Sequence, residues 1–147
     1  YDSDVYVDKI DFIEGNKIMY FKDVSGSSKG ELYFDKTKID YDVKINDVYY
    51  NEESKQFIYY TDWNNEKDYG TLKIFKKGKA EKVYDDVHRF SLTPEGEVLF
   101  LYDYSMNSYK GDLYMYKNGK SKKIDEEVVT IFSYDGEDRG GYIYGWW

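Results

Sequence analysis

Cysteine is absent from the 147-residue chain, and proline occurs only once. Without cysteine there is no disulfide scaffold and no thiolate site for metal or redox chemistry. No apolar run approaches the roughly 20 residues that a membrane-spanning helix needs. Alanine and leucine are scarce, and no stretch combines a helical period with caps, so the sequence argues against an α-helical fold.

The charge balance is acidic, with 29 aspartates and glutamates against 21 lysines and arginines and a formal net charge of -8. Such a chain lacks the basic footprint of a nucleic-acid-binding protein. Its low mean hydropathy is typical of disordered chains, but those are poor in aromatic residues. Here aromatics make up 20% of the chain, and 19 residues are tyrosines. We therefore expect one folded domain over residues 1–147, with no cofactor and no nucleic-acid partner.

A short motif of glycine, any residue and leucine, followed by aromatic or branched residues, occurs three times. Its glycines lie 40 and 41 residues apart, at Gly30, Gly70 and Gly111. An aromatic-rich run followed by an aspartate precedes each glycine, and a lysine, a branched residue and an acidic stretch ending in valine follow it. Markers that keep one phase indicate tandem segments. Their bounds are about 6–43, 44–87 and 88–128, with a partial fourth segment over 129–147.

Each segment is expected to form four short antiparallel strands. In the third segment these strands are predicted near residues 88–91, 97–102, 112–116 and 121–125. Asn118-Gly119 predicts a two-residue type I′ hairpin turn, and Lys77-Gly78 has the matching place in the second segment. The acidic stretches are expected to be solvated loops between segments. They contain Asp40, Asp42, Asp85, Asp86 and residues 125–127.

Several groups of residues together resemble a known repeat. They are Phe90-Ser91, Pro94-Glu95-Gly96, Asp112-Leu113-Tyr114 and Gly119, and residues 132–136 repeat the opening group. This pattern is similar to the repeat of TolB-like bacterial β-propellers. The resemblance implies an all-β, propeller-like fold of tandem four-stranded blades, and it implies no catalytic residues. It also implies a bacterial protein outside the cytoplasm, either secreted or in the cell envelope.

The chain holds about three and a half such blades, whereas propellers usually close with roughly four to eight. Three explanations remain open: part of a larger propeller, an open curved array, or a half-ring completed by a second copy. Open blade edges favour self-association, because their unpaired backbone groups invite strand pairing. A β-sandwich or β-barrel is a further alternative.

No catalytic constellation is evident in the sequence. His88 is the only histidine, and Ser91, three residues further along the same predicted strand, points to the opposite face. We therefore expect His88 to lie on the surface of a blade, without a catalytic partner. Asp135, Glu137 and Asp138 lie in a glycine-rich loop and are weak candidate ligands for Ca²⁺, although they lack the EF-hand spacing.

Aromatic side chains are the better candidates for ligand binding, because rings beside amides and carboxylates suit the recognition of peptides or sugars. The candidates are Trp63, Asn64, Tyr69, Trp146 and Trp147. The first three lie in a predicted loop over residues 62–69. We predict a non-catalytic binding or scaffold module that recognises a protein, peptide or glycan. Two alternatives remain: part of a propeller hydrolase or lyase with an acidic site, and a purely structural accessory domain.

Overall fold

The computed structural model describes residues 5–13, 15–26, 28–93, 95, 97–132 and 143–146. These residues are all-β, as the sequence predicts, and their one helical element is the 3-10 turn η1 (Ile45–Asp47). The strands are β1 (Val5–Ile13), β2 (Lys17–Ser25), β3 (Lys29–Phe34), β4 (Thr37–Lys44), β5 (Tyr49–Asn51), β6 (Gln56–Asn64), β7 (Tyr69–Lys76), β8 (Lys79–Leu92), β9 (Val98–Ser105), β10 (Lys110–Lys117), β11 (Lys120–Phe132) and β12 (Ile143–Trp146).

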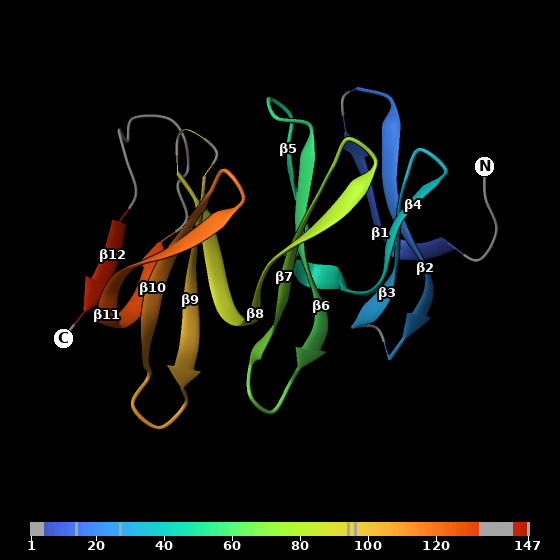
Figure 1. Ribbon diagram of the computed structural model, residues 1–147. Coiled ribbons are helices and arrows are strands. Elements are labelled where there is room, and N and C mark those ends of the chain that lie inside the picture. The colour runs from blue at the N-terminus through green and yellow to red at the C-terminus, as the bar shows by residue number, and fades with distance from the viewer. Residues whose placement is uncertain are drawn as a thin grey trace. The chain divides into compact units, whose positions relative to one another are not determined.

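The strands form an antiparallel meander. Their hydrogen-bonded order is β1-β2-β3-β4-β6-β7-β8-β9-β10-β11-β12, and the short β5 pairs with β6 (Figure 1). This order is open, because no pairing among the described strands joins β1 to β12. The four strands predicted for the third segment coincide with parts of β8, β9, β10 and β11. Their arrangement as a propeller blade stays a prediction.

The chain divides into two compact units. Unit 1 comprises residues 1–63 and 73–82, and unit 2 comprises residues 64–72 and 83–147. The buried core of unit 1 contains Ile13, Met19, Phe21, Leu32, Ile39, Val43, Ile45, Phe57 and Tyr59. The buried core of unit 2 contains Leu99, Leu101, Leu113, Val128 and Ile131. Each unit therefore holds its strands together by burying its own set of apolar side chains.

Three hairpins turn through two-residue loops. The loops are Asp35-Lys36 between β3 and β4, Lys77-Gly78 between β7 and β8, and Asn118-Gly119 between β10 and β11. All six residues have positive φ, from 48° to 78°. Positive φ at both loop positions is the signature of the type I′ turn, whose twist matches that of the flanking strands. The structure thus confirms the turns predicted at Lys77-Gly78 and Asn118-Gly119.

The acidic stretches, expected as loops, lie inside strands instead. Asp42 belongs to β4, Asp86 to β8 and Glu127 to β11, with φ values of 55°, 55° and 53°. A left-handed residue within a strand produces a bulge, which bends the strand without ending it. The strand registers shift beside Asp42 and beside Glu127. Strands β8 and β11 therefore continue through the boundaries that the sequence places between segments.

The aspartate that precedes each motif glycine also has a left-handed backbone conformation. Asp23, Asp62 and Asp103 have φ values of 48°, 53° and 54° and lie in β2, β6 and β9. Aspartate tolerates this backbone region better than most residues, because its short polar side chain can bond locally. The recurring aspartate is thus a backbone feature of the sheet.

Two of the three motif glycines, Gly30 and Gly111, lie where a bulged neighbouring strand comes close. A Cβ atom at Gly111 would lie 3.0 Å from the Tyr102 carbonyl oxygen and 3.2 Å from the Tyr104 Cα, on either side of the bulge in β9. A Cβ atom at Gly30 would lie 3.0 Å from Val24 Cγ2, next to the bulge in β2. Because a Cβ atom at these distances would force the neighbouring strand to shift, the recurring glycine and the recurring aspartate belong to one packing feature.

Candidate functional site

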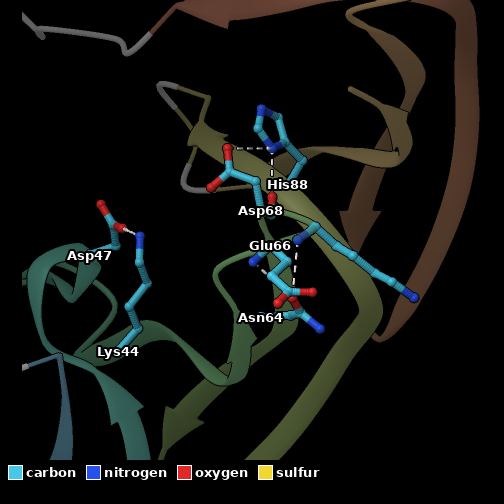
Figure 2. A network of polar contacts seen from close by, with 7 residues as sticks. Lys44, Asp47, Asn64, Glu66, Asp68 and His88 are labelled. Atoms are coloured by element: carbon cyan, nitrogen blue, oxygen red, sulfur yellow. Dashed lines mark hydrogen bonds and ion pairs between the residues drawn. The ribbon is translucent and has the colours of Figure 1, made fainter. Parts of the chain in front are cut away.

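The predicted loop over residues 62–69 is shorter than expected, because β6 extends to Asn64 and β7 begins at Tyr69. Trp63 therefore lies within a strand, and only 7% of its surface is exposed. Its ring meets Tyr60 edge-on, with centroids 4.9 Å apart, and Lys44 Nζ lies 4.0 Å from the Trp63 ring centroid. Lys44 also pairs with Asp47 (Figure 2). These contacts place Trp63 in the packing of unit 1, with a cation on its ring.

Asn64 holds the loop that joins β6 to β7. Its Oδ1 accepts hydrogen bonds from the backbone N–H groups of Glu66 and Lys67, at 2.9 and 3.0 Å (Figure 2). The backbone N–H of Asp68 donates to the carbonyl oxygen of Asn64 at 2.8 Å. Tyr69 is half-buried at the start of β7. The Asn64 side chain therefore has a structural role in the turn.

His88 is held between two neighbours in unit 2. Its Nδ1 lies 2.7 Å from the backbone carbonyl oxygen of Asp68, so Nδ1–H donates to that oxygen (Figure 2). The Asp68 carboxylate is 3.5 Å from the same nitrogen. The His88 ring stacks on Tyr104, with centroids 3.8 Å apart and planes 9° from parallel. These contacts give His88 a role in the packing of unit 2.

The remaining sequence candidates lie at or beyond the limits of the described residues. The backbone of Trp146 ends β12. Trp147, Asp135, Glu137 and Asp138 lie outside the described residues. Within the described part of the chain, no group of three or more histidine, aspartate or glutamate side chains could hold a metal ion. No helix there is long and apolar enough to cross a membrane.

Unit 1 has an open groove lined by aromatic and charged side chains, and we call it the aromatic groove. Its volume is about 460 Å³, within the range of roughly 300–1,000 Å³ typical of ligand pockets. The lining residues come from the ends of β2 to β7 and from the loops at those ends. They are Lys17, Phe34, Asp35, Thr37, Ile39, Tyr50, Lys55, Phe57, Phe75, Lys77 and Gly78.

Packed aromatic rings form the apolar part of the aromatic groove. Phe57 is buried, and Phe34, Tyr50 and Phe75 pack half-buried against the core of unit 1. The ring centroids of Tyr50 and Phe57 are 4.6 Å apart, and those of Phe34 and Phe57 are 5.3 Å apart. Tyr50 also stacks on Phe34 at 5.7 Å. Rings that support one another in this way present a preformed apolar surface.

The charged part of the lining is mainly basic. Lys17, Lys55 and Lys77 line the groove together with one acidic residue, Asp35. Lys17 Nζ lies 5.9 Å from the Phe34 ring centroid, within reach of a cation–π interaction. The whole chain carries a formal net charge of -8. The aromatic groove is therefore a locally basic site on an acidic protein.

The groups in this lining are able to hold a ligand. The lining contains one carboxylate, that of Asp35, and no histidine or serine. Glycoside hydrolysis usually needs a pair of carboxylates, and acyl transfer needs a nucleophile activated by a base. Lysine ammonium groups and aromatic rings can hold and orient a ligand.

Sequence reasoning missed the aromatic groove, since its residues come from separate stretches of the chain. A local signal was present. Phe34 directly precedes the turn Asp35-Lys36, and Phe75 lies two residues before the turn Lys77-Gly78. Ring-bearing strand ends beside lysine-containing turns mark two sides of the groove, but strand pairing is needed to bring them together.

Comparison with known proteins gives no match, either to a protein-family model or to an individual curated protein.

Proposed function

We propose that this chain is a non-catalytic binding module and that the aromatic groove of unit 1 is its ligand site. The observation that carries the proposal is the union of four packed rings with three lysines in a groove of about 460 Å³. Apolar contact with the rings supplies affinity, and a few polar groups orient the ligand.

The wider setting of the proposal follows the resemblance to TolB-like repeats. In that setting the meander belongs to a propeller-like array, and the protein acts outside the cytoplasm of a bacterium. Two-residue hairpins and bulged strands are compatible with tandem blades. The ligand would then be a protein, peptide or glycan met outside the cell.

The test is a titration of the isotope-labelled chain with pools of short peptides and of oligosaccharides, followed by the shifts of its backbone amide resonances. We expect the shifts to gather on residues that line the aromatic groove. The substitution Tyr50→Ala should weaken binding about tenfold, because it removes one contact between a ring and the ligand.

Tyr109→Ala is the matched control. Tyr109 is 60% exposed in unit 2 and is not part of the groove lining. This variant should bind as the parent does. Binding that is unaffected by Tyr50→Ala, binding mapped to another surface, or no binding from any pool would overturn the proposal. Turnover of a bound ligand would overturn its non-catalytic part.

A further inference from the structure

We infer that the occupant of the aromatic groove is an acidic peptide segment that carries an aromatic or large apolar side chain. The inference rests on the proposed function and adds the chemistry of the ligand. It is argued from the donors and acceptors in the lining, from the placement of the lysines and from the charge contrast with the rest of the chain.

The polar lining is rich in donors and poor in acceptors. A lysine ammonium offers three donors and no acceptor. The lining contains three lysines, one carboxylate (that of Asp35) and the hydroxyl groups of Thr37 and Tyr50. Sugar hydroxyls both donate and accept, so a neutral glycan would find few acceptors in this lining. Carboxylates only accept when ionised, and they therefore match the lysines best.

Two of these lysines are placed by the backbone rather than left on flexible loops. Lys77 has a φ of 52° in the two-residue turn after β7, and Lys55 has a φ of 57° at the end of the loop between β5 and β6. That loop is held by Asn51, whose Oδ1 accepts hydrogen bonds from the backbone N–H groups of Glu53 and Ser54. Fixed attachment points lower the ordering cost of binding an anionic ligand.

The apolar half of the groove selects for a side chain that can pack on rings. Phe34, Tyr50, Phe57 and Phe75 offer ring faces and edges within one lining. An aromatic or large apolar side chain gains most from such a surface. Carboxylates on either side of that anchor would then meet the lysines. Although the chain has a net charge of -8, the three lysines of this groove attract an acidic segment locally.

The experiment compares four probes by fluorescence polarisation or by their displacement of a labelled peptide. The first is a pool of capped peptides in which glutamates and aspartates flank a central phenylalanine or tyrosine. The second has lysines as the flanking residues, and the third has serine at the centre. The fourth is an oligogalacturonate, which carries carboxylates on a sugar chain. We expect the first pool to bind most tightly.

The test variant is the double replacement Lys55→Glu and Lys77→Glu, and its control is Lys120→Glu with Lys122→Glu. The control lysines are exposed on β11 in unit 2, and each pair changes the net charge by the same amount. The first variant should weaken binding of the acidic pool about tenfold or more, whereas the control should change it less than twofold. Equal losses in both would mean attraction to charge alone and would overturn the inference.

Failure of the inference can be told apart from failure of the proposed function. Tighter binding of the basic pool, of the serine pool or of oligogalacturonate within the aromatic groove would overturn the acidic-peptide assignment and leave the binding function standing. Absence of any groove-mapped binding would overturn both. Concentration-dependent self-association that Tyr50→Ala abolishes would replace the peptide with a second copy of this chain.

Discussion

Unit 1 and unit 2 place different side chains at corresponding positions of the sequence pattern. In unit 1, Asp40 Oδ2 accepts a hydrogen bond from the Tyr59 hydroxyl at 2.9 Å and lies 3.3 Å from Lys73 Nζ. In unit 2 the same three positions hold Tyr84, Phe100 and Tyr114. Their ring centroids lie 5.2 to 5.5 Å from one another.

A second pair of corresponding contacts also differs in chemistry between the two units. Lys44 places its ammonium 4.0 Å from the Trp63 ring centroid in unit 1. At the corresponding positions in unit 2, His88 stacks on Tyr104 at 3.8 Å. The paired, bulged strands bring the same positions of the pattern into contact in both units. The side chains at those positions can then be either polar or aromatic. Backbone geometry is thus the shared element, and the side-chain chemistry is free to differ.

The largest loss of stability is expected from the aromatic cluster around Tyr84 in unit 2. Tyr84→Ala removes a ring that contacts Phe100, Tyr102 and Tyr114, and should lower the free energy of unfolding of unit 2 by about 3 kcal/mol. Amide hydrogen exchange of β9 and β10 measures this loss. The exposed Tyr109 is the control, and Tyr109→Ala should stay within about 0.5 kcal/mol. Wild-type exchange rates in Tyr84→Ala would mean that the ring cluster adds no stability.

An intermediate effect is expected for the polar contact of unit 1, and it depends on pH. Burial, reinforced by the Asp40 carboxylate, raises the pKa of the Tyr59 phenol above its ordinary value of about 10. Below pH 10 both the folded and the unfolded chain keep this proton. Above pH 10 the unfolded chain loses it first, so the free energy of unfolding should fall by up to about 1.4 kcal/mol per pH unit.

Tyr59→Phe separates this contribution from the other tyrosines. The variant should be about 1 kcal/mol less stable at pH 8, because it loses the hydrogen bond to Asp40. It should then lose less stability than the parent between pH 10 and 11, as measured by urea unfolding. The exposed Tyr49 provides the control, since Tyr49→Phe should keep the parent slope. Identical alkaline slopes in the parent and Tyr59→Phe would contradict the assignment.

The smallest effect concerns the cation on Trp63. Lys44→Met keeps an apolar stem and removes the charge, and should cost about 1 kcal/mol in the free energy of unfolding. His88→Lys copies the unit 1 arrangement into unit 2 and should stay within about 1 kcal/mol of the parent. Thermal unfolding of both variants, with the exposed Lys67→Met as control, measures the difference. A larger loss in His88→Lys than in Lys44→Met would show that the two contacts are not interchangeable.

The parts of the fold that depend on local chemistry could be predicted from the sequence. Asn118-Gly119 and Lys77-Gly78 predict two-residue turns, because few residue pairs accept positive φ at both positions. The bulges could not be predicted in the same way. Asp86 and Glu127 look like loop residues in an acidic stretch, and only strand pairing on both sides shows that β8 and β11 continue.

The burial of Trp63 also differs from the loop position that the sequence predicted. At the end of β6, Thr61 and Trp63 are buried, whereas the left-handed Asp62 and its neighbour Asn64 are exposed. This in/out alternation is that of a strand, and it was missed because the sequence predicted a loop from residue 62 onwards. The aromatic groove could not be predicted from the sequence, because its lining depends on which hairpin ends lie together in unit 1.

The unbroken course of β8 sets how this protein can be divided or copied. A cut between Val87 and His88, where the sequence pattern restarts, would split β8 and leave both halves without their full set of strand hydrogen bonds. The loops after Asn64 and Ser105 can be opened without breaking a strand. Division points that keep every strand whole therefore fall in these loops, out of phase with the repeating sequence pattern.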